Sequence, residues 1–217
     1  MSIYQHTLFE KEESICVNKY KIRKIQYVEA LPFILEIHYA KRVPSISYAY
    51  GLFCKKELVG IISYGTPASP SLCKGVAGEK NKDLVLELNR LVLKNNKKNE
   101  ASILISASLK LLPKPKIIVS YADTEQSHIG VVYQATNFIF TGTSIERTDM
   151  ASEDGKHSRH HLGDVTKRIK RSSKHRYLYV IGNKKDKKRL SKELKYKQFK
   201  YPKKVVKYLD KTLAYIP

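Results

Sequence analysis

Apolar and polar positions along the chain repeat with two periods, one typical of strands and one typical of helices. A period close to two over Lys21–Val28 predicts a strand with one exposed face, and helical spacing over Glu29–Tyr39 predicts a helix after it. Two runs rich in Ile, Val, Tyr and Phe, Ser45–Lys55 and Glu57–Gly65, meet at a short charged turn and predict a β-hairpin. The stretch Thr66–Lys82 is rich in Pro, Ser and Gly and is predicted to be a loop.

The second half of the chain alternates strands with helices. Buried strands are predicted at Asp83–Leu93, Lys116–Asp123 and Phe138–Gly142, and helices at Asn99–Leu112 and Gly130–Thr136. Strand–helix alternation favours parallel crossover connections, whereas the hairpin favours an antiparallel start. We therefore predict an α/β (α+β) fold built around one mixed sheet.

Charge divides the chain into two parts. The 217 residues include 41 Lys and Arg against 20 Asp and Glu, a formal net charge of +21. Residues 156–217 hold 21 of these cations and four acids, so this segment carries +17 and residues 1–155 carry +4. A nearly neutral body with a basic segment is typical of a core that binds a polyanion. We predict a catalytic core over 1–155 and a basic C-terminal extension over 156–217 that packs on it, with Tyr177–Ile181 as a further strand.

Cysteine usage and hydropathy bear on the cellular compartment. Cys16, Cys54 and Cys73 lie far apart and form no CxxC pair, which argues against a disulfide framework and a thiolate zinc site. No stretch approaches the roughly 20 apolar residues that cross a bilayer, and the first residues do not resemble a signal segment. We expect a soluble, cytoplasmic protein without a membrane partner.

Three short sequences carry a resemblance to a known family: Leu88–Leu91 (LNRL), Ser120–Thr124 (SYADT) and His128–Gly142 (HIGVVYQATNFIFTG). They resemble the bacteriophage Mom family of adenine-modifying proteins, and the element order resembles the GNAT-like acyltransferase fold. The resemblance extends more weakly to His38–Tyr39 and to Lys174–Tyr177. It implies a transferase, encoded by a phage or prophage, that acts on double-stranded DNA in the host cytoplasm. There it would convert the exocyclic amine of adenine to a carbamoylmethyl derivative and so protect the DNA from restriction.

The catalytic candidates combine this resemblance with position in the predicted fold. Asp123 closes a strand at the edge where α/β sheets place their chemistry, so it is a candidate general base, or else a cap of the following turn. Tyr133 is a candidate proton donor to a leaving thiolate, as in relatives of the superfold, or else half-buried packing. The resemblance adds His38, Tyr39 and Ser120 near the substrate, although His38 equally suits the C-terminal end of a helix.

Cofactor expectations also come from the resemblance. The resemblance implies an iron site with His38 and Asp123 as ligands, although two ligands are fewer than such a site needs. Proteins with the GNAT-like fold bind the pyrophosphate of the donor with a glycine-rich turn before a helix. The corresponding segment here, Lys94–Ser102, has no glycine. Asn99 and Ser102 still favour phosphate at the helix N-terminus. The donor is therefore acyl-CoA or another activated compound.

Polar residues interrupt one predicted buried strand and need an explanation. These are Glu87, Asn89 and Arg90, for which a structural ion pair and the wall of a site remain alternatives. Alternation puts Glu87 and Asn89 on one face and Arg90 on the other. We predict that Glu87 and Asn89 line the substrate cleft, and we count Arg90 with them among the residues that bind substrate or donor. Tyr121 is expected beside them, where it or Tyr39 stacks on a base that has been flipped out of the duplex.

Dense basic runs in the C-terminal extension predict contacts with DNA phosphates, which give affinity but little sequence choice. A solvated face is the alternative for these runs. The residues expected to bind DNA are Lys167, Arg168, Lys170, Arg171, Lys174, His175 and Arg176. Two other functions remain open from the sequence. They are an acetyltransferase acting on a protein or a small amine, and a nucleic-acid-binding protein without catalysis.

Overall fold

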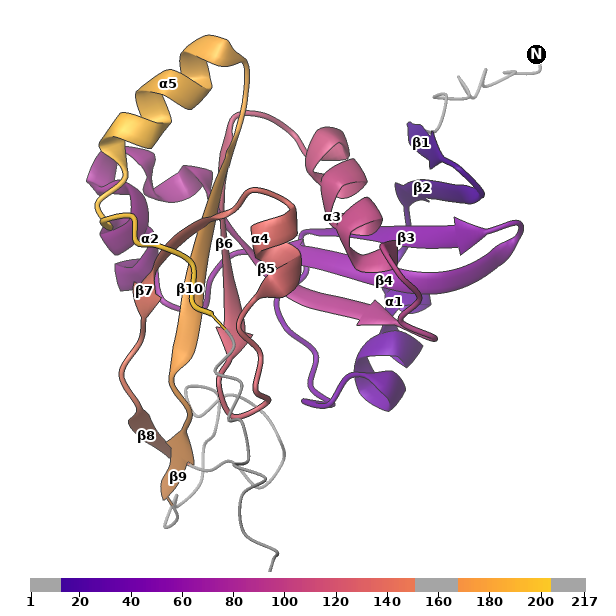
Figure 1. Cartoon of the computed structure of the whole chain (residues 1–217), viewed down its shortest axis with the longest axis horizontal. Helices are drawn as coiled ribbons and strands as arrows, with labels where there is room; N and C mark the ends of the chain where they lie inside the picture. The colour runs from indigo at the N-terminus through magenta and orange to yellow at the C-terminus, as the bar shows by residue number, and fades with distance from the viewer. Residues whose placement is uncertain (1–12, 151–167, 204–217) are drawn as a thin grey trace, which may run out of the picture.

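A computed structural model describes residues 13–150 and 168–203 (Figure 1). Its centre is an eight-stranded mixed sheet in the order β1-β2-β3-β4-β5-β6-β10-β7, which confirms the predicted mixed α/β fold. The strands of this sheet are β1 Ser14–Val17, β2 Tyr20–Lys24, β3 Tyr48–Cys54, β4 Glu57–Gly65, β5 Val85–Leu93, β6 Lys116–Asp123, β7 Ile139–Thr143 and β10 Lys174–Ile181. A separate two-stranded sheet pairs β8 (Arg147–Met150) with β9 (Arg168–Arg171).

Helices cover both faces of the sheet. The face called here the α3/α4 face carries α3 (Glu100–Leu111) and α4 (Val131–Ala135), which pack on one apolar cluster. The opposite face, the α1/α2/α5 face, packs against two further clusters. Its helical elements are α1 Tyr27–Pro32, a π-helical turn Phe33–Ile37, α2 Pro70–Ala77, a 3-10 turn Glu79–Leu84 and α5 Lys184–Glu193. No helix of the described residues is long and apolar enough to cross a membrane.

Alternation along β6 decides which layer each of its side chains meets. Ile118 packs with α3 and α4, whereas Ile117 and Val119 pack with α2 and α5. Tyr121 packs against the same cluster as Val119. Asp123, two positions further along the strand, therefore projects on the α1/α2/α5 face.

The central parallel pair, β5 and β6, separates at its C-terminal ends (Figure 1). Pairing between the two strands runs from Val85 with Ile117 to Leu88 with Ser120. Beyond that point β5 stays paired with β4, and β6 stays paired with β10. Each strand thus follows its outer neighbour, and the side chains after Leu88 and Ser120 flank the point where the two strands diverge.

The predicted loop over Thr66–Lys82 contains α2 and most of the 3-10 turn. Ser69 is the N-cap, and its hydroxyl accepts a hydrogen bond from the Leu72 N–H at 3.4 Å. Pro70 occupies the first turn, where its missing N–H costs nothing. Serine and proline at this point therefore start a helix, and buried Cys73 and Val76 hold it on the sheet.

The basic C-terminal segment contributes an internal strand to the main sheet. β10 pairs with β6 on one side and with β7 on the other. Tyr177 and Leu178 are fully buried on opposite faces, which an internal strand requires. The boundary predicted at residue 155 therefore does not separate this strand from the core. Residues 156–167 and 204–217 of the predicted extension lie outside the described residues.

Candidate active site

Polar side chains gather on the α1/α2/α5 face where β5 and β6 diverge. Their charges act on one another: Arg90 and Lys174 act on Glu87, while Asp123 and Arg90 act on Tyr39. Two of these residues come from β5, one from the end of β6, one from the start of β10 and one from the segment after the π-helical turn. The fold thus brings together predicted site residues from four separate parts of the chain.

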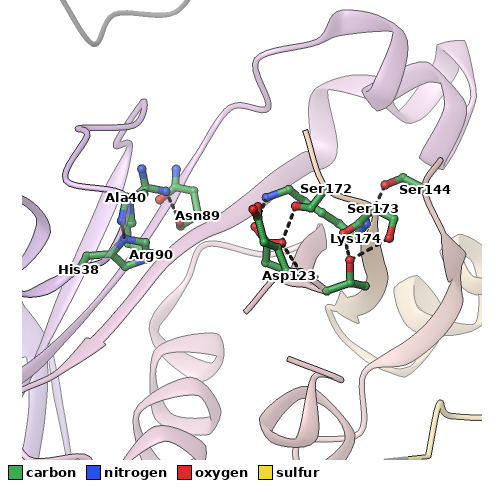
Figure 2. Close-up of polar contacts among 11 residues, drawn as sticks. His38, Ala40, Asn89, Arg90, Asp123, Ser144, Ser172, Ser173 and Lys174 are labelled. Atoms are coloured by element: carbon green, nitrogen blue, oxygen red, sulfur yellow. Dashed lines mark hydrogen bonds and ion pairs between the residues drawn. The ribbon is translucent and has the colours of Figure 1, made fainter. Parts of the chain in front are cut away.

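Asp123 is held by several hydrogen-bond donors (Figure 2). Lys174 Nζ lies 2.8 Å from Oδ2, and Ser172 Oγ and the Glu125 N–H lie 2.6 and 3.1 Å from Oδ1. Burial alone would raise the pKa of Asp123, but the hydrogen bonds from Lys174 and Ser172 outweigh it and hold the pKa below its usual range. An ion-paired carboxylate of lowered basicity is a weak proton acceptor. This geometry argues against Asp123 as the general base.

Glu87 has the properties that Asp123 lacks. Its side chain is half-buried, and no hydrogen bond or ion pair among the described residues engages its carboxylate. Burial raises the pKa of Glu87, and the charges of Arg90 and Lys174 only partly offset that rise. A carboxylate with a raised pKa holds a proton more strongly, so it is the better acceptor of a proton from a substrate. Glu87, expected only to line the cleft, is therefore the better base.

The two neighbours of Glu87 in the predicted cleft, Asn89 and Arg90, are engaged within the fold. Asn89 Oδ1 accepts from Ser63 Oγ at 2.7 Å, and its Nδ2 donates to the Ser45 carbonyl at 2.6 Å. Both ends of the amide are used, which does not suit a substrate contact. Arg90 Nη2 donates to the Arg42 carbonyl at 2.6 Å and so fixes the segment after Tyr39. Figure 2 shows this group on one side of the site.

His38 is a neutral hydrogen-bond donor at this site. The Ala40 N–H donates to His38 Nδ1 at 3.1 Å, which leaves the ring proton on Nε2. Burial, helped by the positive charge of Arg90, lowers the pKa of His38 to about 4. The ring stacks on Tyr39 with centroids 4.4 Å apart, and Tyr39 is 54% exposed. The pair therefore offers an N–H and an accessible aromatic face.

The predicted iron site does not fit these contacts. His38 Nδ1 already accepts a hydrogen bond, and both oxygens of Asp123 are engaged. Figure 2 places the two residues in separate groups. Within the part of the chain that the structure describes, no three His, Cys, Asp or Glu side chains come together as a metal site.

Tyr133 lies at the same point of the sheet but on the α3/α4 face. Burial raises its pKa to about 12, against the opposing effect of the Ser120 hydroxyl, and the charges of Tyr39 and Glu87 add to the rise. Ser120 Oγ also donates to the Leu88 carbonyl at 3.1 Å, at the last paired position of β5 and β6. The phenol thus stays protonated at neutral pH beside the divergence of the two strands. This position suits the predicted role of Tyr133 as a proton donor.

The N-terminus of α3 is filled by a carboxylate from the helix itself. Glu100 is 2% exposed, and its oxygens accept from the Lys97 N–H and the Tyr20 hydroxyl, each at 2.9 Å. Ser102 Oγ donates to the Asn99 carbonyl at 3.0 Å. A buried negative charge at this position repels a phosphate. The prediction that Asn99 and Ser102 receive the donor phosphate therefore disagrees with the geometry, and an acid at the helix start was the signal in the sequence.

Several residues predicted to bind DNA instead make contacts inside the fold. Lys174 forms the ion pair with Asp123. Arg176 donates from Nη2 to the Thr141 carbonyl at 2.9 Å, and its guanidinium lies 3.3 Å from the ring centroid of Tyr196. These two cations are therefore not free to meet phosphate.

The other predicted DNA contacts differ in how far the structure describes them. His175 Nδ1 lies 2.8 Å from Thr143 Oγ1. Lys170 is exposed, and Arg171 is half-buried, both on β9. Lys167 and the side chain of Arg168 lie outside the described residues. Tyr121 is half-buried against the α2 and α5 cluster, which leaves Tyr39 as the exposed aromatic ring.

Comparison with known proteins places the chain in one family. The model of the Mom protein family matches residues 19–203. Over 112 residues the chain is 35% identical to the methylcarbamoylase Mom of Escherichia phage Mu, and this match spans 49% of the chain and 46% of the phage protein. The chain thus aligns with about half the length of that curated relative.

Solved structures similar to this chain include two bacterial acetyltransferases. The ribosomal-protein-S5-alanine acetyltransferase of Vibrio fischeri is 11% identical with a TM-score of 0.47, covering 79% of this chain and 98% of its own. An acetyltransferase of Bacillus subtilis in complex with CoA is 12% identical with a TM-score of 0.45, covering 76% of this chain and 99% of its own.

Proposed function

Because the chain belongs to the Mom protein family, we propose that it is a transferase that modifies the exocyclic amine of adenine in duplex DNA. The reaction is carbamoylmethylation or a related group transfer, and its product shields the DNA from restriction. One observation of the structure supports this proposal above the others. A half-buried carboxylate that has no hydrogen-bond partner among the described residues, Glu87, and a neutral buried phenol, Tyr133, lie on opposite faces of the sheet at the divergence of β5 and β6.

A base and an acid at one point are what this transfer needs. The lone pair of the adenine amine is delocalised into the ring, so the nitrogen attacks well only if it loses a proton during the step. Glu87 accepts that proton while the nitrogen bonds to the electrophilic carbon of the donor. The bond from that carbon to its leaving atom breaks, and Tyr133 gives the leaving atom a proton. Each proton transfer contributes about 10²–10⁴-fold in rate.

The remaining side chains of this face orient the base. Tyr39 presents an exposed ring on which an extruded adenine stacks. The N–H at His38 Nε2 is available to an acceptor atom of the base, since burial and Arg90 keep the ring neutral. Asp123 acts through Lys174. Their ion pair fixes the ammonium group, and the charge of that group lowers the pKa of Glu87.

The donor is proposed to approach from the α3/α4 face, where Tyr133 can reach its leaving group. The group donor is proposed to be acyl-CoA or another activated compound, but the carboxylate of Glu100 disfavours binding of a pyrophosphate at the start of α3. A groove of about 340 Å³ runs beside α3 and is lined mainly by apolar side chains. Its residues include Ile15, Val17, Ile103 and Ala107. This lining suits the uncharged arm of a donor rather than its phosphates.

The test is nucleoside mass analysis of DNA from cells that express the protein. We expect a new adenine derivative with the parent chain, a loss of about 10²-fold or more with Glu87→Gln, and parent levels with the exposed control Glu57→Gln. Unchanged nucleosides from cells with soluble, folded parent protein would overturn the proposal. In that case, transfer of labelled acetyl groups to protein or small amines would favour an ordinary acetyltransferase.

A further inference from the structure

The exposed surface of α5 is formed by lysines, with its acids turned toward the protein. On a helix of 3.6 residues per turn, Lys184, Lys188 and Lys192 fall on one side, opposite the fully buried Leu190. Lys185 lies on the exposed side next to them. With Lys195 and Lys197, which follow the helix and are also exposed, these residues form what is called here the lysine ridge.

The acids of this segment do not neutralise the ridge. Asp186 closes the capping box with Asn183, and Glu193 accepts hydrogen bonds from Asn81 and from Arg189. No ion pair among the described residues involves a lysine of the ridge. The positive charge of the ridge is therefore left for a partner.

The ridge is attached to the same face as the candidate active site. Arg189 Nη1 donates to Asn81 Oδ1 at 3.2 Å, and the Lys195 N–H donates to the Val76 carbonyl at 3.0 Å. Tyr196 lies under the guanidinium of Arg176, a residue of β10. Helix α5 and the segment after it are thus fixed to α2 and β10 rather than projecting away from the core.

Lysines in this arrangement make the isolated helix less stable. Like charges at positions i and i+4 cost about 0.2–0.5 kcal/mol per pair, and Lys184 to Lys188 and Lys188 to Lys192 are two such pairs. Cations in the first turn also oppose the helix dipole. A polyanion bound along this side reverses both effects, since each phosphate replaces a repulsion by an attraction.

The distance from the ridge to the active site suits a duplex. Strand β10 connects them, because Lys174 pairs with Asp123 at one end and α5 begins shortly after Ile181 at the other (Figure 1). Its eight residues extend over about 26 Å at about 3.3 Å per residue. The same length of B-form DNA holds about eight base pairs at 3.4 Å each. A duplex lying parallel to β10, over the helices of the α1/α2/α5 face, therefore reaches from the site to the start of α5 within one helical turn.

We propose that the lysine ridge binds the phosphates of a DNA duplex over a stretch that extends to about eight base pairs from the adenine that enters the active site. This inference rests on the proposed function. A single strand fits less well, because its bases stack on exposed aromatic rings. Tyr196, the ring that lies between two lysines of the ridge, is covered by Arg176. The exposed rings further along the segment, Phe199 and Tyr201, contact Phe140 and the Phe138 carbonyl rather than α5.

The experiment compares two variants with the same change in charge. The ridge variant carries Lys184→Gln, Lys185→Gln, Lys188→Gln and Lys192→Gln. Its control carries Lys21→Gln, Lys24→Gln, Lys55→Gln and Lys56→Gln, four exposed lysines on β2 and the β3–β4 turn, toward the other edge of the sheet. Binding to a 25-base-pair fluorescent duplex is measured at several salt concentrations.

We expect the ridge variant to bind at least tenfold more weakly, and its slope of log K against log salt to fall by about 3–4, near 0.9 for each lost phosphate contact. The control is expected to keep the parent slope to within about one contact. Equal losses in both variants, or none in the ridge variant, would overturn the assignment. A pair of changes after the helix, Lys195→Gln with Lys197→Gln, provides an independent variant, for which we expect a fall of about 2.

Two further measurements separate this inference from the proposed function. Glu87→Gln should bind the duplex with the parent slope although it no longer modifies DNA. If the salt slope of binding falls in the ridge variant but neither the parent nor any variant modifies DNA, the ridge assignment is supported and the proposed function is wrong. If the parent modifies DNA and the ridge variant keeps the parent's salt slope, the ridge assignment is wrong and the proposed function is unaffected. Tighter binding of the parent to a single-stranded RNA of equal length than to the duplex would also overturn the assignment.

Discussion

Replacing Lys174 by Met tests how the Asp123–Lys174 ion pair supports the site. The change keeps the length and the apolar part of the side chain and removes its charge. Asp123 then loses the donor at 2.8 Å and keeps those from Ser172 and from the Glu125 backbone. A hydrogen bond to a charged group contributes about 1.5–3 kcal/mol. Because the Lys174 side chain is 35% exposed, solvent screening reduces this, and we expect the variant to lose about 1–2 kcal/mol.

The loss should depend on pH with a definite sign. The contacts of Asp123 hold its pKa below the usual range in the folded protein, against about 3.9 in the unfolded chain. The stabilisation is therefore complete above about pH 5 and disappears as the pH falls through the lowered folded value. Urea unfolding of parent and variant should differ at pH 7 and converge toward pH 3. The control is Lys170→Met, which removes an exposed lysine of β9.

The same variant should also change catalysis through Glu87. The charge of Lys174 lowers the pKa of Glu87, so its removal raises that pKa further. Since a general base acts when deprotonated, the rising limb of the pH–rate profile should move to higher pH in Lys174→Met. An unfolding difference that is the same at pH 7 and pH 3, together with an unmoved profile, would refute the assignment of Lys174 as a positioning residue.

Three other changes test the acid, the base and the start of α3. The parent pH–rate profile should rise through a pKa above the 4.3 or so of a free Glu, because burial raises the pKa of Glu87, and Glu87→Gln should abolish that limb while Asp123→Asn keeps it. Tyr133→Phe should lower kcat by about 10²-fold with little change in the midpoint of thermal unfolding, whereas unchanged kcat would remove Tyr133 as the acid. Glu100→Ala should cost about 1–2 kcal/mol in urea unfolding through the lost cap, and a variant as stable as the parent would contradict that role.

The sequence predicts the sheet better than it predicts the site. Period-two and continuous apolar runs locate β4, β5 and β6 within a few residues, because strand burial follows local hydrophobicity. The same local signals misassign α2, since Ser69 and Pro70 serve equally in a loop and at a helix start. Local composition describes a residue and its neighbours in sequence, and this is enough for elements that form from such neighbours.

Roles in the site depend on contacts between distant residues. From the sequence, Asp123 is a candidate general base. In the structure Lys174, 51 positions away, donates a hydrogen bond to it. From the sequence, Glu87 is one of several polar residues in a strand. Its burial, and its lack of a hydrogen-bond partner among the described residues, are seen only in the structure. The order of their basicities is set by these neighbours, so no sequence pattern of β5 or β6 alone could have ranked the two candidates for the general base.

The two carboxylates of the site have different surroundings. Hydrogen bonds from Lys174 and Ser172 hold the pKa of Asp123 below its usual range. The ion pair with Asp123 also fixes the positive charge of Lys174, which partly offsets the rise that burial causes in the pKa of Glu87. On the other face, the phenol of Tyr133 is protonated at neutral pH, as a proton donor must be. The divergence of β5 and β6 is what allows both conditions at one point, because the two groups can then meet the same reacting atoms from opposite sides of the sheet.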